Sequence, residues 1–162
     1  MKSTLSVILA IAATTIASSA YACTCLGLPK TAIDARIYIE RSDLVALVYV
    51  AEHSHRAWVE NDIRKHDAFA RTIVRRSFKG LPANSEVYFD LGSASTCAPR
   101  FQLQHTYLVF ATGPGPDGRF STTMCSMGQI RADIDEAGYE EHNKLLQSII
   151  APTIDAIERA LE

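Results

Sequence analysis

Four cysteines constrain this 162-residue chain more than any other feature. Cys23 and Cys25 are separated by one residue, and Cys97 and Cys125 follow much later in the chain. An even number of cysteines in an exported chain implies disulfides rather than free thiols. In an extended Cys-x-Cys segment the two Cβ atoms lie roughly 6.6 Å apart, farther than the ~3.5–4.5 Å of a disulfide, which disfavours a Cys23–Cys25 bridge. We therefore expect Cys23 and Cys25 each to pair with one of the two distant cysteines, in either arrangement.

Residues 1–22 have the features of a secretory signal. Lys2 supplies the positive start, an apolar stretch covers residues 5–16, and Ala20-Tyr21-Ala22 fits the small-x-small cleavage pattern. The stretch is shorter than the ~20 apolar residues that a membrane span requires. We expect cleavage after residue 22, so that Cys23 begins the mature chain and the protein is secreted or periplasmic. A lipoprotein signal is the rival interpretation, but the residues before Cys23 match a lipobox less well.

Composition excludes several classes of protein. About 140 residues remain after cleavage, enough for one domain with a single core. The net charge of −2 includes no basic run, so we expect no nucleic-acid partner, and no later segment is apolar enough for stable membrane insertion. The chain has no Gly-x-Ser-x-Gly elbow, no His-Glu-x-x-His motif and no phosphate-binding loop. We therefore expect a non-enzyme without a cofactor.

Alternating and aliphatic patterns predict a mainly β domain. The run over residues 44–50 is uninterrupted and aliphatic, which is typical of a strand buried on both faces. Polar residues 53–65 predict a long loop. Turn residues separate further apolar segments, which favours a small barrel or sandwich. The other strands are expected over residues 69–78, 86–91, 106–111 and 120–124.

Helices are expected at the two ends of the domain. Residues 31–41 have apolar residues at near-helical spacing, with Thr31 as a candidate N-cap. After Gly138 an apolar stripe runs from Leu145 to Leu161, and Pro152 divides it into two helices. This stripe is more typical of a core-facing surface than of a dimer seam. The oligomeric state does not follow from the sequence.

Other residues are candidates for binding. His53, His55 and His66 could ligate a metal ion, although histidines in a polar loop are more often solvated. Trp58 in the same loop could be a binding anchor or could pack against the domain. Two sets of residues are further candidates. The first is a basic row that could bind an acidic partner or form a solvated strand face, and it consists of Arg71, Arg75, Arg76 and Lys79. Four thiolates could bind zinc, but the paired Cys-x-x-Cys knuckles of such sites are absent.

The cysteine pattern and several short motifs together resemble the N-terminal domain of tissue inhibitors of metalloproteinases, a netrin-like module. The similarity runs from Cys23 to about Gly128. The matching residues are Cys23-Thr24-Cys25, Ser42-Asp43-Leu44-Val45, Phe78-Lys79-Gly80, Cys97 and Thr122-Thr123-Met124-Cys125-Ser126. The resemblance implies a five-stranded barrel of the OB type over residues 23–130, with residues 131–162 as a helical extension packed on it.

The resemblance also implies a function and a site. It implies disulfides Cys23–Cys97 and Cys25–Cys125, and a zinc metalloendopeptidase as the partner. The amine and carbonyl of Cys23 would chelate the protease's zinc, and Thr24 would enter the specificity pocket. The inhibitory ridge would then be Cys23, Thr24, Cys25 and Leu26, flanked by a loop of Ser93, Ala94, Ser95 and Thr96.

Two departures separate this chain from that family. The animal domain has a third disulfide, for which this sequence has no cysteines, and a disulfide-rich C-terminal domain in place of the helices expected here. Netrin-like barrels also occur as plain binding modules. The alternative to an inhibitor is therefore an exported, disulfide-linked adhesion or binding module in which Cys23 is only structural.

Overall fold

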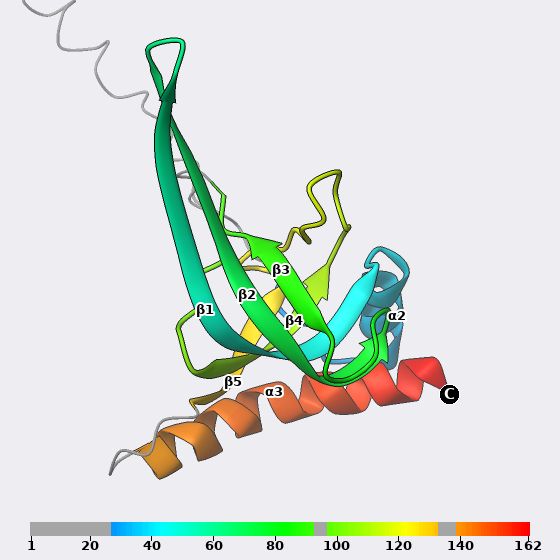
Figure 1. Cartoon of the computed structure of the whole chain (residues 1–162). Coiled ribbons are helices and arrows are strands. Elements are labelled where there is room, and N and C mark those ends of the chain that lie inside the picture. Colours follow the sequence, from blue (N-terminus) through cyan, green and yellow to red (C-terminus); the bar gives the residue numbers. More distant parts are fainter. Residues whose placement is uncertain (1–26, 93–96, 133–138) are drawn as a thin grey trace, which may run out of the picture.

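The computed structural model describes residues 27–92, 97–132 and 139–162, which form a mainly β fold (Figure 1). A helix, α2 (Ala32–Glu40), precedes one antiparallel sheet of strand order β3-β2-β1-β4-β5, and a long helix, α3 (Tyr139–Leu161), follows it. The strands are β1 (Leu44–Glu60), β2 (Ile63–Lys79), β3 (Glu86–Asp90), β4 (His105–Ala111) and β5 (Met127–Ala132).

The sheet is not closed into a barrel, and this corrects the closed barrel expected from the sequence. β3 and β5 lie at opposite ends of the strand order, and no ladder joins them within the described residues. The segment around residue 120 makes only isolated bridges, Phe89 with Phe120 and Thr112 with Ser121. Single bridges connect β3 with the end of β4 at this point, without forming a continuous strand.

The fifth strand lies later in the chain than the sequence pattern predicted. Residues 120–124 alternate as a strand would, but a turn interrupts them. The Ser126 N–H donates to the Thr123 carbonyl at 3.0 Å, and the Thr123 N–H donates to Ser126 Oγ at 3.1 Å. Hydroxyl side chains of this kind compete with ladder hydrogen bonds for backbone groups. β5 therefore begins only at Met127.

β1 and β2 form one long hairpin that extends past the rest of the sheet (Figure 1). The expectation of a loop over residues 53–65 was wrong, because the pairing continues to Glu60 and Ile63. Asn61 and Asp62 make the two-residue turn, with φ of 51° and 59°. Positive φ at both central residues is typical of a type I′ turn, which Asn and Asp tolerate. The polar residues of this segment thus belong to paired strands and to the turn between them.

The start of β1 is buried on both faces, as predicted. Leu44, Ala46 and Val48 belong to a core cluster on the inner face of the curled sheet, together with Phe89 and Phe120. The intervening side chains face a second cluster on the other side of the sheet. That cluster lies beneath the two helices and includes Ile39, Val45, Leu108, Phe110, Ile150 and Ile157.

The N-terminal helix matches the prediction. Thr31 is the N-cap of α2, and its Oγ1 accepts a 3.2 Å hydrogen bond from the Asp34 N–H. Such a cap satisfies one of the free amides of the first turn. Ala35 and Ile39 are the buried residues of α2. Both residues belong to the second core cluster and fix α2 against the sheet. They therefore also position the residues that lead into α2.

The C-terminal segment is one helix, not the two expected. Pro152 lies inside α3, which runs along the sheet in Figure 1. A proline within a helix costs ~3 kcal/mol or more. Ile150 and Ile157, on either side of it, are almost fully buried, and each such burial contributes about 1.5–3 kcal/mol. Packing on the sheet therefore offsets the cost, while Leu145, Ile149 and Leu161 of the same apolar stripe stay largely exposed.

Neither helix of the described chain combines the length and the apolar character that crossing a membrane requires.

Candidate functional site

The predicted inhibitory ridge, Cys23–Leu26, lies outside the described residues, and so does the flanking loop 93–96. The described chain begins at Gly27 and resumes at Cys97 after the gap. The structure describes a frame of residues that flank both segments along the chain. This frame consists of the first described residues, the end of α2 and the loops that carry Cys97 and Cys125.

The loops that carry the two later cysteines lie next to each other. The Met124 N–H donates a 3.2 Å hydrogen bond to the Cys97 carbonyl, which brings Cys97 beside Cys125. Neither of these two cysteines is a free thiol. Cys23 and Cys25, their predicted partners, lie outside the described residues. The pairing Cys23–Cys97 and Cys25–Cys125 therefore stays a prediction.

Two contacts hold the chain in place directly after the predicted ridge. The Tyr38 hydroxyl donates a 3.0 Å hydrogen bond to the Gly27 carbonyl. Leu28 packs against Gly128 of β5: a Cβ at Gly128 would lie only 2.6 Å from Leu28 Cδ1 and 2.5 Å from Ile150 Cδ1. Only glycine leaves room for both side chains there. The segment that continues from Cys25 is thus fixed to α2, α3 and β5.

A groove of about 590 Å³ opens beside Gly27. Phe110 and Ile37 contribute apolar surface, and hydroxyl groups of several serines and threonines surround it. The lining residues are Gly27, Leu28, Pro29, Asp34, Ile37, Tyr38, Arg41, Ser42, Phe110, Thr112, Ser121, Thr122, Thr123 and Ser126. The groove therefore joins the first described residues to the turn that carries Cys125.

The motif residues that carried the resemblance have structural roles around this groove. Lys79 Nζ donates hydrogen bonds to the carbonyls of Ile39 at 2.8 Å and Ser42 at 2.5 Å. A cation at this position compensates the free carbonyls of the helix C-terminus. Gly80 has φ of +93°, and a Cβ there would lie 2.5 Å from the Asp43 carbonyl oxygen. These residues lock the end of β2 onto the end of α2.

The Thr122–Ser126 turn is held by its own hydroxyl groups. Thr122 is buried, and its Oγ1 donates a 2.9 Å hydrogen bond to the Phe110 carbonyl. Ser126 Oγ lies 3.2 Å from Thr122 Oγ1 and 3.0 Å from Thr123 Oγ1. The sequence analysis named this segment as a motif and predicted a strand over residues 120–124. Its dense run of threonine and serine is the signal that could have indicated a turn instead of a strand.

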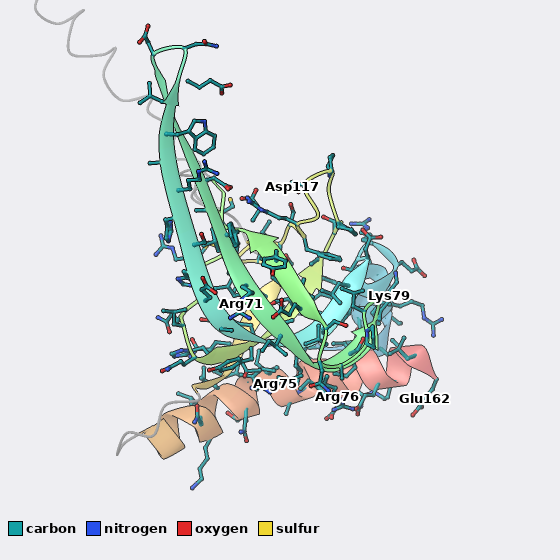
Figure 2. All side chains as sticks on the ribbon, viewed as in Figure 1. Arg71, Arg75, Arg76, Lys79, Asp117 and Glu162 are labelled. Atoms are coloured by element: carbon teal, nitrogen blue, oxygen red, sulfur yellow. The ribbon has the colours of Figure 1, made fainter. Side chains whose placement is uncertain are left out.

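The basic row on β2 has intramolecular partners (Figure 2). Arg71 pairs with Glu52 at 3.0 Å and with Glu86 at 2.9 Å, and the hydrogen bond that Arg71 donates to Glu52 is the main cause of a raised pKa of Arg71. Arg76 pairs with Glu158 of α3, and the Arg75 guanidinium lies 4.7 Å from the ring centre of Tyr49. These contacts favour a structural strand face over a surface for an acidic partner.

The three histidines and Trp58 lie on the long hairpin. The rings of His53 and His55 lie 6.4 Å apart at nearly right angles. Burial, and secondarily the proximity of His55, lowers the pKa of His53. No group of three metal-ligating side chains occurs in the part of the chain whose side chains are described. Trp58 is 38% exposed, with the Arg56 guanidinium 5.9 Å from its ring centre, so it does not pack into the domain.

No protein-family model matches the chain, and no curated protein matches it. The resemblance to metalloproteinase inhibitors rests on the motif residues alone and stays a prediction.

Proposed function

We propose that this protein is an exported inhibitor of zinc metalloendopeptidases, which binds the catalytic zinc through the amine and carbonyl of Cys23. The observation that carries the proposal is the convergence of three segments. Gly27 lines the same groove as Thr123 and Ser126, and the turn between these two residues is hydrogen-bonded to Cys97 through Met124. A Cys-x-Cys segment two residues before Gly27 needs this arrangement if it is to form bridges to both later cysteines.

Rigidity of this frame supports the proposed activity. Leu28 and Gly27 are fixed to neighbouring elements by packing and by the Tyr38 hydrogen bond. Bridges from Cys23 and Cys25 would add two further attachments to the same end of the fold. A segment held in its bound shape loses little conformational entropy on association, which favours tight binding.

The chemistry of an N-terminal cysteine fits a protease zinc site. Catalytic zinc ions in proteases have three protein ligands and one position open to water. The α-amine, with an ordinary pKa of about 7.7–8.0, loses its proton readily near neutral pH. The amine and carbonyl of Cys23 would occupy the open position as a five-membered chelate. Thr24 would enter the adjacent specificity pocket, with Leu26 and residues 93–96 beside it.

The inhibitor proposal includes a specific fold type for the sheet. We infer an OB-type, netrin-like module of which residues 119–122 form the incomplete closing segment. The bridges of Phe120 to β3 and of Ser121 to the end of β4 support it, because they lie where a closing strand would run.

The second candidate is an exported binding or adhesion module without inhibitory activity. The long β1–β2 hairpin favours it, since Trp58 and Val59 near its tip are 38% and 66% exposed. Aromatic residues on a projecting element are frequent anchors in protein interfaces. In this candidate the cysteine pairs only attach the N-terminus to the sheet.

Inhibition assays separate the two candidates. The protein is purified after export, its N-terminus is sequenced, and cleavage of a fluorogenic peptide by a panel of zinc metalloendopeptidases is measured. A serine endopeptidase is the control enzyme. Thr24→Gly is expected to weaken inhibition about tenfold or more, since it empties the specificity pocket, whereas Ser148→Ala on α3 leaves it unchanged. Failure to inhibit any zinc enzyme, or an acylated N-terminus, favours the binding module.

A further inference from the structure

We propose that His53 and His55 form a binding site for a divalent late first-row transition-metal ion, such as Cu²⁺ or Zn²⁺, on the inner face of the β1–β2 hairpin. Imidazole nitrogen is a preferred ligand of both ions. This site belongs to the protein itself and does not depend on the inhibitor proposal, in which the zinc is that of another protein.

The register of the hairpin places the two histidines on one face. Side chains two residues apart on a strand lie on the same side of it. His53 pairs with Ala70, a fully buried residue of the inner core cluster, and His55 pairs with Ala68. The histidines therefore continue the inner face of β1 beyond the core. The residues that face both histidines across the hairpin are alanines, whose small side chains carry no competing polar group.

One imidazole nitrogen of the pair lacks a hydrogen-bond partner. His53 Nε2 is inaccessible to solvent and makes no hydrogen bond in the described chain. A buried polar atom of this kind costs free energy unless it is paired, and an unfilled ion site is one of the recognised reasons for it. A metal ion bound at Nε2 would satisfy the atom.

The distance between the His53 and His55 rings is close to that of two imidazoles bound to one metal ion. A tetrahedral ion about 2 Å from each nitrogen holds two imidazole rings with their centres about 5 Å apart. The rings of His53 and His55 are 6.4 Å apart, at an angle of 88°. His55 is exposed, so rotation of its side chain can close the difference while His53 stays in place.

The charged residues near His53 and His55 bind one another instead of the histidines. Glu52 lies between Val50 and His53 on β1, and its carboxylate is bonded to Arg71. Arg71 in turn bridges to Glu86 of β3. The ion pairs of Glu52 and Glu86 are formed with Arg71 and not with either histidine. His66 pairs with Ala57 in the register, one step further toward the tip, and the proposal rests only on the two histidines whose rings are described.

The test is metal binding by the exported protein, purified without a histidine tag. Cu²⁺ is titrated by calorimetry, and electron paramagnetic resonance identifies nitrogen ligands. We expect one ion that is bound through imidazole nitrogen. His53→Gln and His55→Gln should each weaken its binding by about tenfold or more, which is what perturbing a metal site typically costs. His142→Gln on α3 is the matched control and should leave the affinity unchanged.

Both variants are checked by circular dichroism and thermal unfolding, since glutamine preserves polarity and most of the volume at these positions. Binding by the cysteine amine would persist in all three variants, so a loss confined to the hairpin variants supports the proposal. Cu²⁺ affinity and nitrogen signals that are the same in the folded double variant His53→Gln/His55→Gln as in the parent protein would overturn it. No binding of either Cu²⁺ or Zn²⁺ by the parent protein would overturn it as well.

Discussion

The Tyr38 hydroxyl donates a 3.0 Å hydrogen bond to the carbonyl of Gly27, two residues after Cys25. The Tyr38 ring also packs edge-on against Phe110, with the ring centres 5.2 Å apart. One side chain of α2 thereby connects the start of the described chain to β4 in the second core cluster. This contact fixes Gly27 to the domain.

Replacing Tyr38 with phenylalanine removes the hydrogen bond and keeps the ring. We expect Tyr38→Phe to lower the free energy of unfolding by about 0.5–1.5 kcal/mol, the usual net contribution of one hydrogen bond. The proposed inhibition should weaken as well, because the ridge is less firmly held. Urea denaturation and the inhibition constant measure the two effects. Tyr49→Phe is the control, since Tyr49 contacts Arg75 through its ring. Equal stability of both variants would show that the Gly27 contact contributes nothing.

Adding one methyl group at Gly128 should destabilise the protein. A Cβ there would lie 2.5–2.6 Å from Ile150 and Leu28, so Gly128→Ala forces at least one of them to move. Overpacking of this kind typically costs about 1–3 kcal/mol. Thermal and urea unfolding give the value. Combining Gly128→Ala with Leu28→Ala should cost less than the sum of the single changes, because the double variant removes one clash. Strict additivity would contradict the packing described here.

The ion pair between Arg119 and Asp67 predicts a pH dependence of stability. Arg119 donates hydrogen bonds to both carboxylate oxygens of Asp67, one of them at 2.8 Å. These bonds hold the pKa of Asp67 below its ordinary value of 3.8, against the opposing effect of burial. A lowered folded pKa gives stability that is present above 3.8 and is lost as the pH falls through the folded value.

Asp67→Asn removes this contribution. We expect the variant to be less stable than the parent at pH 6, by about 1 kcal/mol or less because the pair is partly exposed. The difference should shrink as the pH falls below 3.8. Urea unfolding between pH 2.5 and 6 measures it, with Asp62→Asn at the hairpin turn as a control of equal charge. A difference that is constant over this range would show that Asp67 and Arg119 are not coupled.

The hairpin turn predicts a stabilising substitution. Asn61 and Asp62 both have positive φ, and Asn-Gly is the sequence that type I′ turns favour most. Asp62→Gly should therefore raise the free energy of unfolding by about 0.5–1 kcal/mol, since glycine adopts this φ without steric cost. Asp62→Val should lower it, because a β-branched residue is strained at positive φ. Denaturation midpoints of the two variants should move in opposite directions.

The sequence predicted those elements in which the local residue pattern and the final burial of the residues point to the same structure. The aliphatic run of β1 and the Thr31 cap of α2 were recognised because each has one dominant physical meaning. The hairpin beyond residue 53 was missed, since exposed strand residues have the polarity of a loop. The Asn61-Asp62 dipeptide was the available signal. Pro152 was misread because its local cost is offset by the burial of Ile150 and Ile157, which depends on tertiary contacts.

The candidate site was predictable only as a set of residue types. The cysteine pattern predicted that Cys23 and Cys25 each pair with a distant cysteine, and this pairing stays a prediction. The structure shows that the loops carrying Cys97 and Cys125 lie next to each other. The supporting contacts could not be foreseen. The hydrogen bond from Lys79 of β2 to the end of α2 joins positions far apart in the chain, and so does the packing of Leu28 on Gly128. No local sequence pattern encodes these contacts.

The most direct test of the inhibitor proposal is the inhibition constant of a form with one alanine added before Cys23. The addition moves the α-amine off the cysteine and leaves both predicted bridges possible. We expect inhibition to weaken by more than about a hundredfold, about 2.7 kcal/mol of binding free energy, with the melting temperature and the mapped disulfides unchanged. An extended form that inhibits zinc metalloendopeptidases as well as the authentic protein does would contradict chelation by Cys23.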